Sequence, residues 1–247
     1  MKVYFIGAGP GDPEMITVKG ARLIGECPVV IYAGSLVSPE MLKYCAENAE
    51  IHDSASMNLD EQIAVMKKAS DEGKSVARVH TGDPSLYGAT GEQMRELDRL
   101  GIEYETIAGV TSMAASAAAV NRELTMPEIS QTVTITRTPG RTPMPEDIRN
   151  IAKVGGTIAF FLSAGQGKYI SENLISEGWS PNTPVILVYR ATWSDQKTAE
   201  CTLSTLEKTL KDNGMTKHTM ILAGQSLKGS PEADSKLYDK SFSHEYR

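Results

Sequence analysis

The stretch that decides the fold is Val3–Asp12, VYFIGAGPGD, an apolar run that passes directly into a glycine-rich turn. The four consecutive apolar residues Val3–Ile6 are typical of a strand that is buried on both faces. A helical pattern follows over residues 17–26, and Pro28 ends it. A strand, a glycine-rich turn and a helix in this order predict the first element of a parallel α/β sheet.

The same alternation continues along the rest of the chain and predicts the α/β class. Strands are predicted at 29–32, 75–79, 103–107, 132–136, 157–162, 184–189 and 219–223. Helices are predicted at 39–46, 59–72, 91–100, 145–152, 168–177 and 203–212.

The pattern restarts near residues 121–129, which predicts two α/β domains, 1–121 and 122–247, the second with a polar tail from about residue 230. The first sheet is expected to be mainly parallel. The second is expected to be mixed, because the polar stretch 192–202 favours hairpin strands.

Composition narrows the class of protein. Hydrophobic residues make up 40% and charged residues 23% of the chain, as in ordinary globular proteins. The formal net charge of −6 argues against a nucleic-acid partner, since such proteins present a basic face. No long apolar segment predicts a signal peptide or a membrane span. The cysteines, Cys27, Cys45 and Cys201, have no metal-ligand spacing and are typical of reduced thiols in a cytoplasm.

The first glycine-rich turn differs from a dinucleotide-binding fingerprint. Gly11 gives the spacing GxGxG rather than GxGxxG, and the second predicted strand ends in Tyr32-Ala33-Gly34, with no acidic residue for a ribose. Pro10 also lacks the backbone donor that a pyrophosphate would need. A ligand-contacting turn and a purely structural tight turn both remain open.

Two further turns of this kind follow later strands. Residues 81–88, TGDPSLYG, come after the strand at 75–79, and Gly109–Ser112 come after the strand at 103–107. Because ligands bind at the carboxyl ends of parallel strands, three such turns at one edge favour a binding site. Structural alternatives are an Asx turn at Asp83 and a plain helix cap at Thr111 or Ser112.

The remaining polar motifs are less specific. The histidines, His52, His80, His218 and His244, show no metal spacing and no partnered nucleophile, so no metal site is predicted. His80 stands out because it directly precedes Thr81-Gly82-Asp83. Arg137 and Arg141 lie in a Pro/Gly-rich loop that is either solvated or a clamp for carboxylates.

Taken together, these motifs resemble the tetrapyrrole (corrin/porphyrin) methylases. Residues 7–20 resemble the signature GxGPGDPxLLTxKG of that family, with Met15-Ile16 in place of the two leucines. Residues 78–88 and 109–112 resemble its second and third signatures, so the resemblance runs over residues 1–228. Within the family, stretches 31–37, 52–57 and 136–145 are similar to the precorrin-4 (cobalt-precorrin-4) C11-methyltransferases.

The resemblance implies an S-adenosylmethionine-dependent C-methyltransferase of the class III fold, acting on precorrin-4 or cobalt-precorrin-4 at C11 in cobalamin biosynthesis. It also implies a polycarboxylate tetrapyrrole substrate, a homodimer and a cytoplasmic location. Alternatives are a methylase of the same fold acting at another ring carbon, as on uroporphyrinogen-III or precorrin-2, a diphthine synthase-like enzyme, and a nucleotide-binding regulatory module or dehydrogenase.

The resemblance also assigns residues. Cofactor contacts carried over from the family are Pro10, Gly82, Asp83, Leu86, Thr111, Ser112, Leu162, Ala191 and Ala223. Substrate contacts are expected from Gly9, Gly11, Asp12, Arg137 and Arg141. His80 and Asp83 are the candidates for a general base. Leu162 departs from the family, where methionine is common, and so predicts backbone or apolar contact there.

Overall fold

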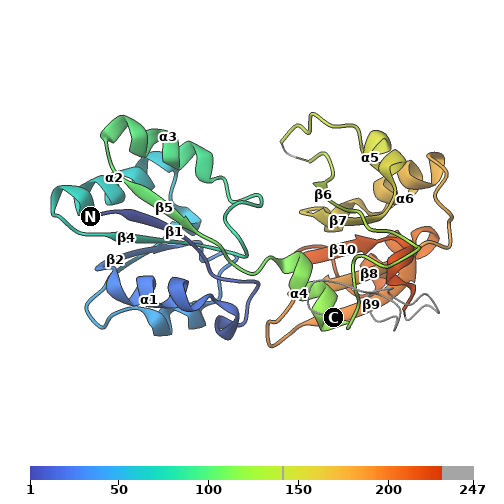
Figure 1. Cartoon of the computed structure of the whole chain (residues 1–247), viewed down its shortest axis with the longest axis horizontal. Helices are drawn as coiled ribbons and strands as arrows, with labels where there is room; N and C mark the ends of the chain where they lie inside the picture. Colours follow the sequence, from blue (N-terminus) through green and yellow to red (C-terminus); the bar gives the residue numbers. More distant parts are fainter. Residues whose placement is uncertain (141, 230–247) are drawn as a thin grey trace, which may run out of the picture. The chain divides into compact units, whose positions relative to one another are not determined.

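A computed structural model of the protein describes residues 1–140 and 142–229 (Figure 1). Its contacts divide the chain into two units. The first contains Met1–Ala115 together with Thr192–Ser194, and the second contains Ser116–Ala191 and the described residues from Asp195 onward. The division near residue 121 expected from the sequence stays a prediction, and the expected polar tail from about residue 230 lies outside the described residues.

The first unit is built on a sheet of five parallel strands in the order β3-β2-β4-β1-β5. The strands are β1 (Val3–Gly7), β2 (Val29–Tyr32), β3 (Glu50–Asp53), β4 (Val76–His80) and β5 (Tyr104–Ile107). The helices are α1 (Val18–Glu26), α2 (Leu59–Asp71) and α3 (Thr90–Leu100), with 3-10 turns η1 (Pro13–Met15), η2 (Pro39–Tyr44) and η3 (Ser54–Ser56). Helix α4 (Ser112–Ala119) follows β5.

The two faces of this sheet bury different helices. Helix α1 covers one face, where Ile24 packs in one cluster with Ala77 of β4. Helices α2 and α3 cover the other face, where Met66 and Leu97 pack in one cluster with Phe5 of β1 (Figure 1). Because strand side chains alternate between faces, the apolar runs of β1 and β4 supply both clusters.

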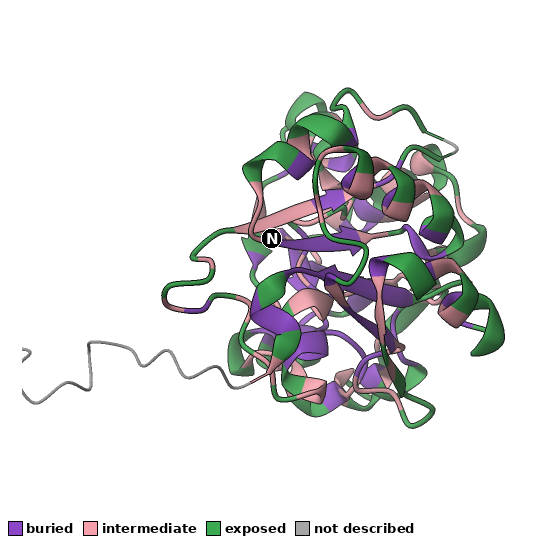
Figure 2. Cartoon of the chain, turned by 90° about the vertical axis from the view of Figure 1, so that its right-hand side faces the viewer, coloured by how far each residue is buried: buried purple, intermediate pink, exposed green. Residues whose placement is uncertain are grey.

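The second unit is built on a mixed sheet in the order β6-β7-β10-β8-β9. Its strands are β6 (Val133–Arg137), β7 (Thr157–Phe161), β8 (Pro184–Tyr189), β9 (Lys197–Thr202) and β10 (Thr219–Ala223), of which only the β6–β7 pair is parallel. Its helices are α5 (Ile148–Val154), α6 (Gly167–Ser176) and α7 (Leu206–Asp212), with 3-10 turns η4 (Ala164–Gln166), η5 (Leu203–Thr205) and η6 (Gln225–Lys228). The buried residues concentrate on the strands (Figure 2).

The α/β class, the parallel first sheet and the mixed second sheet confirm the prediction from sequence. The polar stretch after β8 does form a hairpin strand, β9. Some elements differ from expectation, among them the following two. Strand β3 was not predicted, because Ile51 is its only large apolar residue and an edge strand has one neighbour. The helix expected at 39–46 is the 3-10 turn η2.

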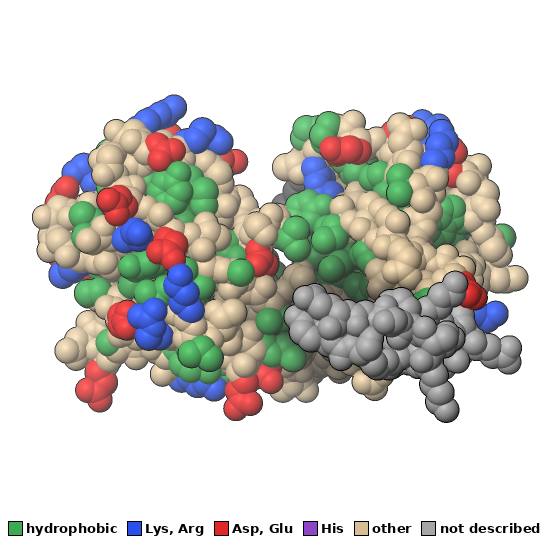
Figure 3. Space-filling model, in the orientation of Figure 1, with side chains coloured by type: hydrophobic (Ala, Val, Ile, Leu, Met, Phe, Trp, Pro, Cys, Tyr) green, Lys and Arg blue, Asp and Glu red, His purple; other side chains and the backbone are tan. Residues whose placement is uncertain are grey.

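On the face of the first unit that Figure 3 shows, acidic and basic side chains are interspersed. In the part of the chain that the structure describes, every helix is too short or too polar to cross a membrane.

Candidate functional site

The three glycine-rich turns of the first unit meet at one edge of its sheet. Strands β4, β1 and β5 are neighbours, so their carboxyl ends lie side by side. The backbones of two turns pair directly, because the Gly82 N–H donates to the Gly9 carbonyl at 2.7 Å and the Gly9 N–H donates to the Gly82 carbonyl at 3.2 Å. The structure therefore brings together the turns that the sequence placed on one edge.

Glycine is required in these turns by close approach of the backbones. A Cβ atom on Gly109 would lie 2.1 Å from the Gly82 carbonyl oxygen, and one on Gly7 would lie 2.6 Å from the Gly109 Cα. Gly9 and Gly82 also adopt φ angles of 78° and 61°, which favour glycine. These glycines thus allow the backbones of the three turns to pack closely against one another.

Asp83 ties the second turn to the third. Its Oδ2 accepts a hydrogen bond from the Gly109 N–H at 2.9 Å, and its Oδ1 accepts from the Ser85 N–H at 2.8 Å and from the Ser85 hydroxyl. Burial opposes ionisation of this carboxyl, but the hydrogen bonds from Ser85 and Gly109 outweigh it and hold the pKa of Asp83 below its ordinary value. Asp83 is therefore an ionised, fixed carboxylate whose two oxygens are both engaged.

The second turn packs against the start of α4. A Cβ atom built on Gly82 would be in ordinary van der Waals contact, 3.9 Å from atoms of Val110, Thr111 and Ser112. Ser112 is the first residue of α4, and the Thr111 hydroxyl accepts from the Met113 N–H at 3.4 Å. Gly82 is buried and Leu86, in the same turn, is half-buried, so this turn and the start of α4 lie together at the edge of the sheet where parallel α/β proteins bind ligands.

The loop Pro10–Asp12 is held by residues that the sequence did not indicate. The Trp193 indole Nε1–H donates to the Pro10 carbonyl at 3.0 Å, and the Asp12 N–H donates to the Thr192 hydroxyl at 2.8 Å. Pro10 and Gly11 are buried, and Asp12 is half-buried. The available signal was a tryptophan, one of two in the chain, in a polar connection between two strands.

His80 is deeply buried at the end of β4. Only 5% of the residue is exposed, and its Nε2 has no hydrogen-bond partner among the residues that the structure describes. Burial, together with the nearby Arg78 guanidinium, lowers the pKa of His80 to about 3. The side chain is therefore neutral throughout the physiological range, a poor match to a base that must take up a proton near pH 7.

In the second unit, Leu162 is an exposed apolar residue with an unusual backbone conformation. It directly follows β7, is 73% exposed, and adopts a φ of 53°, which is rare for a bulky residue. The next residue, Ser163, is fully buried, and its hydroxyl accepts from the Thr138 N–H at 2.8 Å. An apolar side chain held out in a strained conformation is typical of functional sites. The other residues assigned here, Ala191 and Ala223, are buried.

Arg137, the last residue of β6, makes hydrogen bonds to the loop that follows it. The Arg137 guanidinium donates to the carbonyls of Thr138 and Thr142, each at 3.3 Å, and to the Pro143 carbonyl at 2.5 Å. The Arg137 guanidinium therefore holds the loop with N–H groups that were predicted to bind substrate carboxylates. Arg141 lies outside the described residues.

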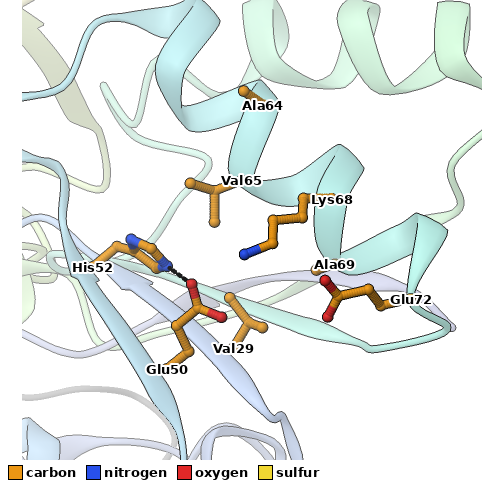
Figure 4. Close-up of a pocket in the computed structure, with 8 residues that line it drawn as sticks. All are labelled: Val29, Glu50, His52, Ala64, Val65, Lys68, Ala69 and Glu72. Carbon is orange, nitrogen blue, oxygen red and sulfur yellow. Dashed lines mark hydrogen bonds and ion pairs between the residues drawn. The ribbon is translucent and has the colours of Figure 1, made fainter.

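A separate cavity of about 220 Å³ lies between α2 and the edge strand β3 (Figure 4). Its polar lining residues are Glu50, His52, Lys68 and Glu72, and His52 Nε2 lies 2.9 Å from Glu50 Oε1. The cavity also touches Val29, the first residue of β2, so it faces the amino ends of the strands, away from the glycine-rich turns. No residue predicted for the site lines it. Within residues 1–140 and 142–229, no cluster of acidic, histidine and cysteine side chains is placed to hold a metal ion.

The family model of the Tetrapyrrole (Corrin/Porphyrin) Methylases matches residues 2–207. The chain is 50% identical to the cobalt-precorrin-4 C(11)-methyltransferase of Methanocaldococcus jannaschii, over 100% of this chain and 96% of the relative.

Two solved structures are similar in fold. The X-ray structure of a cobalt precorrin-4 methyltransferase has a TM-score of 0.90 and 47% identity, over 92% of this chain and 96% of that one. Uroporphyrin-III C-methyltransferase from Thermus thermophilus, complexed with S-adenosyl homocysteine, has a TM-score of 0.78 and 26% identity, over 94% and 97%.

Proposed function

The chain belongs to the tetrapyrrole (corrin/porphyrin) methylase family and is a C-methyltransferase that uses S-adenosylmethionine, and on that premise we propose that it methylates C11 of precorrin-4 or its cobalt complex. The observation that carries the proposal is the 50% identity, over the whole chain, to a relative named for this reaction. The 26% identity to the uroporphyrin-III enzyme supports the choice of ring carbon, because it is about half as high.

The chemistry fits a site without a nucleophilic side chain. S-adenosylmethionine, when bound, supplies a methyl group that its positively charged sulfur already activates. An electron-rich ring carbon forms the new C–C bond as the S–CH₃ bond breaks, and loss of a proton from the ring restores its charge. The protein needs to orient the two reactants and keep water out, which can supply a large part of the rate acceleration.

We assign the methyl donor to the edge of the first sheet where the three glycine-rich turns meet. Residues of the first unit that would hold it are Pro10, Gly82, Asp83, Leu86, Thr111 and Ser112. The hydrogen bonds of Gly82 to Gly9 and of Asp83 to Gly109 support this assignment, since they hold the three turns together at that edge. In the second unit, we assign contacts to Leu162, Ala191 and Ala223, and the exposure of Leu162 supports its part.

For Asp83 we propose positioning rather than proton transfer. Its low pKa and three hydrogen bonds support a carboxylate that fixes the turn. The neutral, buried imidazole of His80 supports a structural role there.

We assign the tetrapyrrole to the loop 9–12, through Gly9, Gly11 and Asp12, and its carboxylates to Arg137 and Arg141. Replacing both arginines by glutamine tests the second part. We expect the KM for the tetrapyrrole to rise about 10-fold or more, because charge-assisted hydrogen bonds to carboxylates are lost. An unchanged KM would remove the arginines from the substrate site.

One experiment tests the function itself. The protein is incubated with precorrin-4 or cobalt-precorrin-4 and S-adenosylmethionine carrying a ¹³C-labelled methyl group, and the labelled carbon of the product is located by NMR. The proposal expects the label at C11. Label at another ring carbon would assign the chain to a different member of the family, and label in neither product would remove the function.

We also propose that the enzyme is a homodimer in the cytoplasm. Its resemblance to the family supports both statements. Sedimentation equilibrium tests the first, with twice the monomer mass of 26.7 kDa as the expected result.

A further inference from the structure

Residues of the connection between β8 and β9 are hydrogen-bonded to the first glycine-rich turn. Three of its residues, Thr192–Ser194, belong by their contacts to the first unit, although the strands on either side belong to the second. At its base, Arg190 Nη1 lies 2.7 Å from Asp195 Oδ2. Arg190 and Thr192 adopt φ angles of 45° and 70°. A β-branched residue such as Thr192 rarely takes this conformation, so the surrounding contacts hold it there.

The loop Pro10–Asp12 makes two hydrogen bonds to this connection. Gly9, just before it, is held by Gly82 through two backbone hydrogen bonds. Beyond Gly9, the Pro10 carbonyl accepts from the Trp193 indole, and the Asp12 N–H donates to the Thr192 hydroxyl. Local hydrogen bonds hold only the end of the loop, where Asp12 Oδ1 accepts from the Glu14 N–H at 2.8 Å and the Asp12 carbonyl accepts from the Met15 N–H at 3.0 Å. Pro10 has no N–H to donate, so the contact to Trp193 fixes the start of the loop.

The Trp193 ring also occupies the place of a missing side chain. A Cβ atom on Gly11 would lie 2.2 Å from Trp193 Cδ1 and 2.4 Å from Nε1, and the three nearest atoms all belong to this indole. Gly11 does not have a φ in the left-handed region, so the ring, rather than backbone conformation, excludes a side chain there.

We propose that Trp193 is a positioning residue for substrate binding: its indole, seated on Gly11 and hydrogen-bonded to Pro10, fixes the loop 10–12 against which the tetrapyrrole binds. Thr192 assists through its hydrogen bond to Asp12. The proposal rests on the proposed function for the identity of the substrate, but the seating of the indole on Gly11 does not depend on it.

A double-mutant cycle tests the seating. Gly11→Ala displaces the indole, and Trp193→Ala removes it, so each single variant should raise the KM for the tetrapyrrole about 10-fold or more. The KM for S-adenosylmethionine should rise less, because Pro10 is the one residue of the loop assigned to the donor. The double variant should be no worse than Trp193→Ala alone, because the added methyl group then meets no ring. Losses that multiply in the double variant would overturn the proposal.

Conservative variants separate positioning from general stability. Trp193→Phe keeps a ring over Gly11 and loses the donor, so it should recover part of the lost affinity. Thr192→Val keeps the branched shape and loses the acceptor for the Asp12 N–H. Trp179→Phe is the matched control, because Trp179 Nε1–H donates to the Ala152 carbonyl at 2.9 Å and both residues belong to the second unit. It should leave both KM values unchanged.

Fluorescence gives a readout without any substrate. The chain has two tryptophans, so Trp193 is the sole indole emitter in the Trp179→Phe protein. Adding Gly11→Ala should shift the emission to longer wavelength, because the displaced indole enters water. An unchanged spectrum would overturn the seating. If the wild-type enzyme methylates no tetrapyrrole but the shift is seen, the proposed function fails and the seating stands. If it methylates the ring and the cycle is additive, the positioning role fails.

Discussion

The Asp83 carboxylate accepts a hydrogen bond from the Gly109 N–H at 2.9 Å and so joins the turn after β4 to the turn after β5. The other carboxylate oxygen is bound within its own turn by Ser85. One side chain thus links the ends of two strands at the edge of the sheet to which we assign the methyl donor.

Asp83→Asn should therefore weaken binding of the cofactor. The amide oxygen can still accept from Ser85, but the amide nitrogen would face the Gly109 N–H as donor against donor. We expect the protein to lose about 1–3 kcal/mol of its free energy of unfolding and S-adenosylhomocysteine to bind about 10-fold more weakly. Calorimetry and urea unfolding measure both. Ser85→Ala, which keeps the bond to Gly109, should have the smaller effect, and wild-type affinity in Asp83→Asn would contradict the assignment.

Close packing of the turns predicts contrasting effects at two glycines. In Gly109→Ala the new methyl group would meet the Gly82 carbonyl oxygen at 2.1 Å, and backbone cannot move aside as a side chain can. We expect a loss of about 3 kcal/mol or more in the free energy of unfolding.

Gly91→Ala is the matched control. Gly91 lies in α3, where the nearest atom to a new Cβ would be the Arg95 Nη1 at 3.8 Å. This substitution should stabilise the protein by about 0.5 kcal/mol, because alanine is the better helix former. Thermal unfolding of the two variants side by side checks the contrast, and equal effects would contradict it.

His80 predicts a pH dependence of stability. Its pKa falls from 6.5 to about 3 on folding, chiefly through burial and also through Arg78. A lowered pKa gives stability that is present above pH 6.5 and is lost as the pH falls toward 3, because only the unfolded chain then binds the proton. Between pH 6.5 and 5 this loss amounts to about 2 kcal/mol.

His80→Phe removes this contribution. Urea unfolding of the wild-type and variant proteins at pH 7, 6 and 5 should show the difference between their free energies of unfolding changing in favour of the variant as the pH falls. Parallel curves would mean that His80 is not the group responsible. Because the imidazole stays neutral, the activity of the wild type should show no inflection from this residue near pH 6.5.

Leu162 should trade stability for binding. It is 73% exposed with a φ of 53°, so Leu162→Gly relieves the backbone at little loss of burial. We expect the free energy of unfolding to rise by about 1 kcal/mol. Affinity for S-adenosylhomocysteine should fall about 10-fold, since the leucine side chain no longer covers the ligand. Val154→Ala, at a residue that is 63% exposed on α5, is the control and should leave the affinity unchanged. Unaltered affinity in Leu162→Gly would remove this residue from the site.

Much of the fold could be read from local patterns. The predicted strands at 29–32, 184–189 and 219–223 match β2, β8 and β10 residue for residue, because continuous apolar runs mark strands buried on both faces. Helix α2 begins at the capping box of Asn58 and Glu61, close to its predicted start. The edge strand β3 could not be predicted, because its four residues contain one exposed isoleucine and no continuous apolar run.

Some features of the candidate site could likewise be predicted from local sequence, and others could not. The sequence by itself determined the three glycine-rich turns, their place at the carboxyl ends of strands and the family signatures, since these depend on residues next to one another in the chain. Only the tertiary structure decided that Asp83 binds Gly109, that His80 is buried and neutral, that Arg137 closes its own loop, and that Trp193 covers Gly11. Trp193 and Pro10 are 183 positions apart, and contact over such a separation follows from the path of the whole chain, which no local pattern of residues encodes.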